Sequence, residues 1–214
     1  MTRELGGSLN TAGIDDGFFP IECKELRCRT LLVSVLCTGM VIADVRVEPV
    51  TVDGLDGTRI AFKLVKSLNR VPEAIFTDGV TIAGFNVVDP EELYAMTGIP
   101  VVAVFKHELN LGKIREALVK HFPDWSTRYG VIEKVYRRSQ YVQTPWRPLR
   151  ISAYGVPLYR AMDYVIRLQN ISPLPEPLRL ADIIASGLTG SDTLMLTINR
   201  DVLSEWRPKR LCHG

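Results

Sequence analysis

The sequence predicts an α/β protein in which a mixed sheet is flanked by helices. Three observations lead to this fold class: an unbroken apolar run, an alternating segment directly after it, and helical spacing that later alternates with short apolar runs. The chain has 214 residues, a length that favours one large domain. We therefore expect residues 1–214 to form a single domain with a core at about 10–192.

The N-terminal part predicts a meander of three strands. Residues 11–19 are expected to form the first strand, and TLLVSVLC at 30–37 has the continuous apolar pattern of a strand buried on both faces. VIADVRVEPV at 41–50 alternates between apolar and charged side chains, as a half-buried strand does. The short TGM turn between the last two segments makes them neighbours.

Helices and strands then alternate along the chain. Residues 57–68 carry an apolar stripe at helical spacing, and Asp56 is a plausible N-cap. The next elements are a strand at 73–77, a helix at 90–96, a strand at 99–105 and a helix at 111–122. The resulting order, β-β-β-α-β-α-β-α, is that of ribonuclease H-like folds, with a mixed sheet between helices.

The C-terminal third is less regular in pattern. The segment 139–159 is rich in proline and aromatic residues, and we expect it to pack on the sheet. Helices are expected at 160–168 and from about 179 to 185.

Composition indicates a cytoplasmic globular protein. Hydrophobic residues make up 46% and charged residues 23% of the chain, and no apolar run reaches the roughly 18 residues of a membrane helix. The polar N-terminus has no apolar signal core. Cys23 and Cys28 lack a second close-spaced pair that would complete a zinc site. Reduced, mostly buried thiols are the favoured interpretation for these and for Cys37 and Cys212, and an intracellular disulfide stays open for a hyperthermophilic source.

The net charge of +2 is unevenly distributed. Residues 1–105 carry 9 basic and 14 acidic side chains, net −5, whereas residues 106–150 carry 10 and 4, net +6. A basic segment beside an acidic one is typical of a phosphate-binding surface next to a metal-binding cluster. The alternative is that basic helices simply face solvent.

Aspartates follow predicted strand ends. Asp15 and Asp16 end the first strand, Asp78 ends the fourth, and Asp53 and Asp56 lie in the glycine-rich approach to the first helix. In a ribonuclease H-like sheet the first and fourth strands are neighbours, so the carboxylates of Asp15, Asp56 and Asp78 are expected to converge. Converging carboxylates require a cation, and Mg²⁺ accepts a few carboxylates together with water and phosphate. The alternative is local: each aspartate caps a helix or makes a turn.

The sequence also resembles a known family. GIDDGFF, VDGLDGT, FTDGVTIAGFNVVD, TGIPVVAVFKHE, ALVKHFPDWSTR and PEPLRLADIIASGLTGS follow, over residues 10–192, the pattern of the archaeal endonuclease dU family, a relative of endonuclease V. The resemblance implies a ribonuclease H-like nuclease that nicks DNA at deoxyuridine with a divalent metal, Mg²⁺ or in its place Mn²⁺. DNA containing deaminated bases is the implied partner.

Comparison with the endonuclease V pattern implies roles for individual residues. Asp15 matches the first metal ligand, Asp78 matches the aspartate after the fourth strand, and Asp56 stands as a shortened substitute for a catalytic glutamate. Lys106 follows the strand that matches IPTIGVAK, which implies a place near the site and a contact with phosphate; the alternative is an exposed lysine at a strand end. Asp16 is expected to be an outer-sphere helper or a support for the loop at Gly17.

One departure from the endonuclease V pattern concerns the recognition of the base. VTVDGLDG replaces the PYIPG wedge, so Phe85 and Asn86 become the candidates to stack on a displaced base and to read an edge of uracil. The alternative is that Phe85 is core and Asn86 caps a turn. Asp53 and Asp89 are secondary candidates for the metal site, with Asp89 as the alternative cap of the helix at Pro90. Asp182 stands where the family block usually continues with histidine.

Three functions remain open at this stage. The first is a metal-dependent endonuclease for deaminated DNA. The second is a nucleic-acid-binding protein that keeps the fold without activity, an interpretation motivated by the shorter reach of Asp56. The third is a related nuclease acting on deoxyinosine, RNA or branched DNA.

Overall fold

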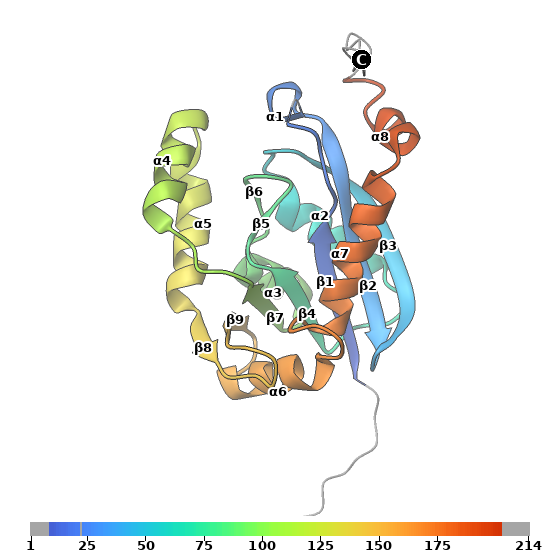
Figure 1. Cartoon of the computed structure of the whole chain (residues 1–214), viewed down its shortest axis with the longest axis vertical. Coiled ribbons are helices and arrows are strands. Elements are labelled where there is room, and N and C mark those ends of the chain that lie inside the picture. The colour runs from blue at the N-terminus through green and yellow to red at the C-terminus, as the bar shows by residue number, and fades with distance from the viewer. Residues whose placement is uncertain (1–8, 22, 203–214) are drawn as a thin grey trace, which may run out of the picture.

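A seven-stranded mixed sheet runs through the computed structural model, which describes residues 9–21 and 23–202 (Figure 1). The strand order is β3-β2-β1-β4-β7-β9-β8. The strands are β1 (Asn10–Asp16), β2 (Arg29–Thr38), β3 (Val41–Thr51), β4 (Ala74–Asp78), β7 (Val101–Phe105), β8 (Gln140–Val142) and β9 (Leu149–Tyr154). Because β1 pairs antiparallel with β2 and parallel with β4, the predicted ribonuclease H-like fold class is confirmed.

Helices cover both faces of this sheet. They are α1 (Cys23–Leu26), α2 (Gly57–Ser67), α3 (Pro90–Thr97), α4 (Leu111–His121), α5 (Trp125–Arg138), α6 (Leu158–Leu168), α7 (Glu176–Thr189) and α8 (Asp192–Ile198). A two-stranded hairpin, β5 (Thr81–Ile82) and β6 (Asn86–Val87), lies between β4 and α3. Among the described residues, no helix combines the length and apolarity needed to cross a membrane.

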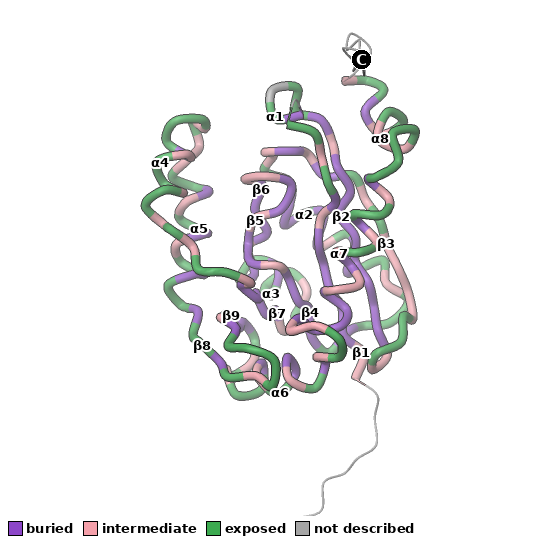
Figure 2. Tube along the Cα trace, in the orientation of Figure 1, coloured by how far each residue is buried: buried purple, intermediate pink, exposed green. Residues whose placement is uncertain are grey.

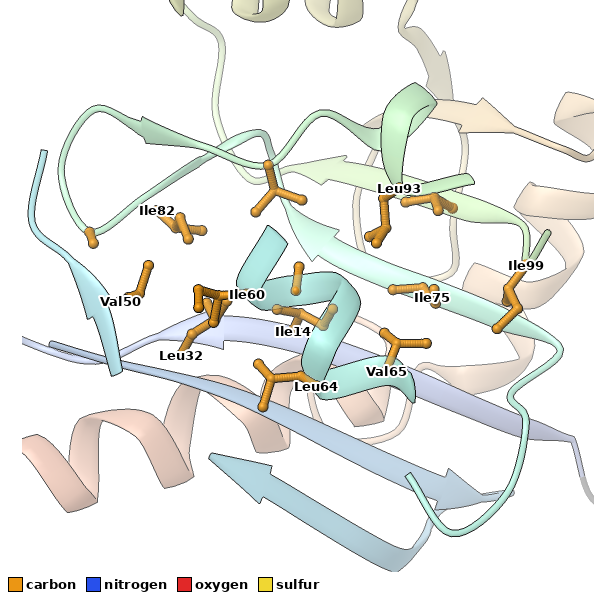
Figure 3. Packing of buried hydrophobic residues seen from close by; sticks show 14 residues of the cluster. Ile14, Leu32, Val50, Ile60, Leu64, Val65, Ile75, Ile82, Leu93 and Ile99 are labelled. Carbon is orange, nitrogen blue, oxygen red and sulfur yellow. The ribbon is translucent and has the colours of Figure 1, made fainter. Parts of the chain in front are cut away.

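The alternating pattern of β4 assigns its side chains to two separate cores. Ile75 packs with Ile60 and Leu64 of α2 on one face of the sheet (Figure 3). Phe76 packs with α6 and α7 on the other face. Both faces of β4 and β7 are therefore buried, which explains why their sequences are unbroken apolar runs (Figure 2).

Gly13 allows α7 to cross β1 at very close range. A Cβ atom at this position would lie 2.2 Å from the backbone carbonyl carbon of Pro177 and 2.3 Å from the backbone nitrogen of Leu178. Since Cβ atoms do not approach backbone this closely, only glycine fits. The contact fixes the position of α7, whose next turn carries Asp182, over the strand that ends with Asp15 and Asp16.

The structure differs from the sequence-based expectation in several elements, of which three bear on the sheet and its covering helices. The first strand ends at Asp16 rather than Phe19. Residues 125–138 form α5, which was not predicted. The segment 139–159 is regular rather than irregular: β8 and β9 pair antiparallel and extend the sheet beyond β7, with the prolines at 145 and 148 in the loop between them.

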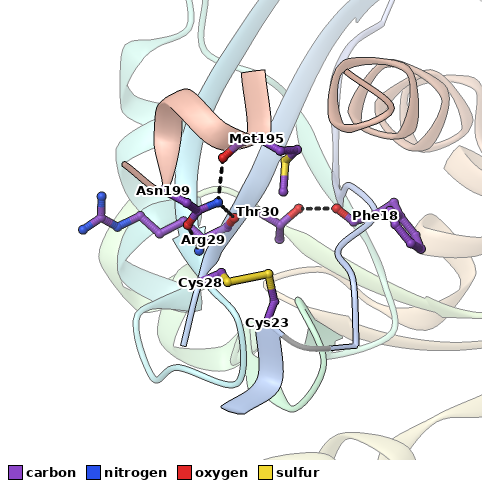
Figure 4. Close-up of a disulfide and its surroundings, with 7 residues drawn as sticks. All are labelled: Phe18, Cys23, Cys28, Arg29, Thr30, Met195 and Asn199. Atoms are coloured by element: carbon purple, nitrogen blue, oxygen red, sulfur yellow. Dashed lines mark hydrogen bonds between the residues drawn. A yellow bond between two sulfur atoms is a disulfide. The ribbon is translucent and has the colours of Figure 1, made fainter. Parts of the chain in front are cut away.

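Cys23 and Cys28 form a disulfide, so the expectation of reduced thiols is wrong for this pair (Figure 4). The single turn of α1 brings their Cα atoms to 4.8 Å, within the range that a disulfide spans. Cys37 is a free, buried thiol, as expected. Cys212 lies outside the described residues.

Candidate active site

Three charged side chains meet where β1, β4 and β7 end. Because β4 runs parallel to both neighbours, the carboxyl ends of all three strands lie at one edge of the sheet. The Nζ atom of Lys106 is 2.6 Å from Oδ2 of Asp78 and 4.0 Å from Oδ2 of Asp15. The predicted meeting of Asp15, Asp78 and Lys106 is thus present in the structure.

Desolvation raises the pKa values of both aspartates at this site. Asp15 is 6% exposed, and its pKa is raised well above the usual value, first by desolvation and then by the negative charge of Asp78. Desolvation also raises the pKa of Asp78, although the hydrogen bond from Lys106 works against the rise. The surroundings therefore disfavour the charged form of both carboxyl groups. A bound cation would stabilise that charged form.

The positive charge of Lys106 partly stabilises the negative charge of Asp78. Desolvation by itself would lower the pKa of Lys106, but the hydrogen bond and the charge of Asp78 outweigh it, and the pKa is raised overall. The lysine is therefore held protonated at the carboxylates. A cleft of about 200 Å³, lined in part by Asp78, Lys106 and His107, opens beside it.

Asp182 is a member of the site that sequence reasoning did not assign. It lies on α7, and its negative charge raises the pKa of both Asp78 and Lys106. The only signal in the sequence was its place in the PEPLRLAD block, where the resemblance pointed to histidine. Asp182 acts on Asp78 because α7 lies over β1.

Asp16 supports a neighbouring loop. Its Oδ2 atom accepts a hydrogen bond of 2.9 Å from the backbone nitrogen of Ala83, a residue with the unusual φ of 43°. Desolvation raises the pKa of Asp16 to about 6. Of the two expected roles, the contacts match that of a loop support, although the loop supported contains Ala83 rather than Gly17.

Asp56 does not contact Asp15, Asp78 or Lys106 in the described structure. Its Oδ2 atom accepts a 3.0 Å hydrogen bond from Oγ1 of Thr51, and its Oδ1 atom accepts one of 2.6 Å from Nδ2 of Asn86. It occupies the N-cap position of α2 as predicted, but its side chain makes no capping hydrogen bond. The expected convergence of three aspartates is therefore not assembled in this structure.

Asn86 is a structural residue, which corrects its expected role in base recognition. It is fully buried; its Nδ2 atom donates to the carbonyl of Thr51 and to Asp56, and its Oδ1 atom accepts from the backbone nitrogen of Gly57 at 2.9 Å. Its amide therefore caps α2 from another segment. With its amide atoms so engaged and out of reach of solvent, Asn86 cannot read a nucleobase.

Phe85, Asp53 and Asp89 have separate surroundings. Phe85 is half-buried against Phe122, with the rings 5.7 Å apart and nearly perpendicular. Asp53 accepts a 2.7 Å hydrogen bond from the backbone nitrogen of Phe85. Asp89 caps α3 and pairs with Lys134 at 2.9 Å, which favours its alternative role as a helix cap.

The donor set at the strand ends fits a hard divalent cation. Within residues 9–21 and 23–202, no group of three or more His, Cys, Asp and Glu side chains is arranged to hold a metal ion. Mg²⁺ needs less than this, because it is commonly bound by one or two carboxylates together with water and substrate phosphate. Asp15 supplies a buried carboxylate and Asp78 a partly exposed one, both with raised pKa values, so the residues present are compatible with Mg²⁺.

Comparison with known proteins gives consistent results. The family model described as endonuclease dU matches residues 8–189. The UPF0215 protein of Thermococcus gammatolerans is 35% identical over 196 residues, which cover 90% of this chain and 99% of that protein.

Two solved structures share the fold. A protein of unknown function from Archaeoglobus fulgidus has a TM-score of 0.72 at 23% identity, covering 84% of this chain and 97% of its own. Endonuclease V of Ciona intestinalis, in complex with DNA containing an inosine, has a TM-score of 0.54 at 16% identity, covering 83% and 84%. The fold is thus endonuclease V-like.

Proposed function

Because this chain belongs to the endonuclease dU family, we propose that it is a metal-dependent endonuclease that nicks DNA at deoxyuridine. Family membership and the endonuclease V-like fold support a nuclease in deaminated-base repair. The observation that carries the proposal within this chain is the pair of Asp15, which is buried, and Asp78, which is partly exposed, at adjacent strand ends with Lys106 between them.

Asp15 and Asp78 are the proposed ligands of Mg²⁺, for which Mn²⁺ can substitute. When bound, such an ion activates water and stabilises the charge of the leaving oxygen in phosphodiester cleavage. Asp182, whose charge already acts on Asp78, is a third acidic candidate. Asp56 stays a proposed ligand as well, and to act as one it has to exchange its contacts with Thr51 and Asn86.

Lys106 is proposed to bind a phosphate oxygen. It is held protonated by Asp78 and is partly exposed at the small cleft, so its ammonium group can exchange a carboxylate for a phosphate oxygen when DNA binds. The segment 106–150, with its net charge of +6, is proposed to contact the DNA backbone on this side.

A second candidate substrate is deoxyinosine. The Ciona endonuclease V was solved in complex with DNA containing an inosine followed by a ribo-adenosine, and this complex supports deoxyinosine as the second candidate. For this chain, the test is a panel of labelled oligonucleotides containing deoxyuridine, deoxyinosine, ribonucleotides or a branch, each incubated with Mg²⁺ or Mn²⁺.

We expect nicking of the deoxyuridine duplex with either metal and none after addition of EDTA. Cleavage of the deoxyinosine duplex alone would replace the proposed substrate. Salt-dependent binding of DNA without cleavage under either metal would instead indicate a binding protein that keeps only the fold.

A further inference from the structure

We propose that a second cleft, beside the strand-end aspartates, binds one unpaired nucleobase; this inference rests on the proposed function. The cleft has a volume of about 640 Å³, within the range of sites for small organic ligands. It lies between α1, the loop after β3 and the turn that joins α4 to α5. Its lining combines apolar side chains, basic side chains and one buried arginine.

The apolar walls come from segments far apart in the sequence. Ile21 and Leu55 are 68% and 57% exposed, an unfavourable arrangement for large aliphatic side chains that nothing covers. Phe85 and Phe122 form the remaining apolar surface, in edge-to-face contact with each other. A planar, apolar-faced ring inserted between these side chains would cover them, as bases do in aromatic and aliphatic pockets.

Arg128 makes this cleft a rigid, preformed one. It is 4% exposed and donates to three backbone carbonyls: Gly54 at 2.8 Å, Phe85 at 2.7 Å and Asp53 at 3.0 Å. Its remaining N–H groups donate to both carboxylate oxygens of Asp124, at 3.0 Å each. The guanidinium is thus fully used in joining the two sides of the cleft, so it holds the walls rather than the ligand.

The rim carries positive charge suited to a phosphate chain. Lys24, Arg27 and His121 line the cleft, and Lys24 and Arg27 are exposed on the segment of α1. Of the two acids in the lining, Asp124 is paired with Arg128. Apolar walls below a basic rim match a nucleotide, with its ring inside and its phosphates outside, better than a purely apolar ligand.

The disulfide fixes the basic part of the rim. Cys23 and Cys28 enclose Lys24 and Arg27 in one short covalent loop. A 2.8 Å hydrogen bond from the backbone nitrogen of Val52 to the carbonyl of Cys28 ties this loop to the residue before Asp53. Both cysteines are buried against Val52, so the loop is anchored at its base.

One residue, Ala83, connects the cleft to the strand-end aspartates through two hydrogen bonds. The backbone nitrogen of Ala83 donates to Asp16, and its carbonyl accepts a 2.8 Å hydrogen bond from the backbone nitrogen of Asp53, which lines the cleft. Asp16 in turn adjoins Asp15. These hydrogen bonds join a wall of the cleft to the loop that Asp16 supports, so we expect the phosphates of a base in the cleft to lie on the side of the aspartates at which cleavage is proposed.

Asp53 gives the cleft a chemical preference. One of its carboxylate oxygens, Oδ1, accepts from the backbone nitrogen of Phe85. The carboxylate accepts hydrogen bonds and does not donate them, and it has acceptor capacity left for an N–H group of a ligand. Uracil carries such a group at N3, where cytosine has a lone pair, so a base that turns its N3 position toward Asp53 is expected to bind better as uracil than as cytosine; a cytosine can donate only from its N4 amino group.

Binding in EDTA tests this site without cleavage. Two short single-stranded oligonucleotides are compared by fluorescence anisotropy, one with a single deoxyuridine and one with an abasic residue in its place. We expect the wild type to bind the deoxyuridine strand more tightly by on the order of 10-fold, the contribution of one stacked base. Leu55→Ala should remove most of this difference, and Lys24→Ala should weaken both strands equally.

Two further variants sharpen the test. Trp146→Ala removes an aromatic residue that is 52% exposed in the β8–β9 loop, away from the cleft lining, and should keep the full difference. Asp53→Asn keeps an acceptor for Phe85 and tolerates the φ of 54°, but it should reduce the preference for deoxyuridine over deoxycytidine.

The outcomes separate this inference from the proposed function. Equal binding of the deoxyuridine and abasic strands by wild type would overturn the base site, even if the protein nicks a deoxyuridine duplex in Mg²⁺. A difference that Trp146→Ala abolishes and Leu55→Ala leaves intact would overturn it too. Base-dependent binding that Leu55→Ala removes, in a protein that nicks nothing, would support the site and refute the proposed function.

Discussion

Replacing Arg128 by alanine should destabilise the protein far more than any ordinary surface change. The arginine is buried, and its removal leaves the carbonyls of Asp53, Gly54 and Phe85 without their donor. Each buried group that loses its partner costs about 1–3 kcal/mol, and water entering from the adjacent cleft reduces the sum. The stacking of the guanidinium on Phe122, 4.4 Å from the ring centroid, is lost as well. We therefore expect a loss of about 3–5 kcal/mol.

Urea denaturation followed by circular dichroism measures this loss, and α5 itself supplies a matched control. Arg137 is 69% exposed and pairs with Glu133 at 2.9 Å, so Arg137→Ala should change the free energy of unfolding by about 0.5 kcal/mol or less. Arg128→Lys should fall between the two variants, because an ammonium group replaces five fixed donors by three. A loss below about 1 kcal/mol for Arg128→Ala would refute the clamp inferred from its hydrogen bonds.

Three further predictions follow from packing and cysteine chemistry. Gly13→Ala forces α7 away from β1 and should cost roughly 1–3 kcal/mol or more in thermal unfolding; a neutral result would contradict the close approach at Pro177. Removing the Cys23–Cys28 disulfide with Cys23→Ser and Cys28→Ser should cost about 2 kcal/mol, and reduction of the wild type should lower Tm similarly, while unchanged values would show that the bond contributes nothing. Burial, together with the charge of Glu176, raises the pKa of Cys37 to about 11, so iodoacetamide at pH 8 should label Cys37 only after unfolding, as peptide mass spectrometry will show; rapid labelling of the folded protein would contradict its burial.

Local sequence pattern is sufficient to predict the helices and strands whose hydrophobic residues follow a strong pattern. The apolar runs of β2 and β7 and the stripe of α2 appear where their patterns place them. Helix α5 was missed because polar and aromatic residues interrupt its apolar face, and it is held by packing against Phe105 and Tyr154. The hairpin of β8 and β9 was missed because its prolines, which lie in the loop, made the whole segment look irregular.

The site was predictable where it depends on strand order alone. Asp15 and Asp78 follow adjacent parallel strands, so their proximity follows from the predicted topology. The positions of the Asp56 and Asn86 side chains depend on tertiary contacts instead. The hydrogen bond between them joins positions 30 residues apart, and neither hydrophobic pattern nor secondary-structure propensity predicts such a contact. Asp182 likewise reaches the site only through the close crossing of α7 over Gly13.

The nicking rate of the Asp15→Asn variant tests the central claim most directly. The substrate is a duplex with one deoxyuridine in Mg²⁺, and the control is Asp163→Asn, which removes a half-exposed carboxylate paired with Arg167 on α6. The bound metal contributes several kcal/mol by stabilising charge in the transition state, and Asp15→Asn removes one of its proposed ligands. We therefore expect the nicking rate to fall by roughly 100-fold or more for Asp15→Asn and to stay unchanged for Asp163→Asn. Equal rates for wild type and Asp15→Asn would contradict the assignment of the strand-end aspartates as the catalytic metal site.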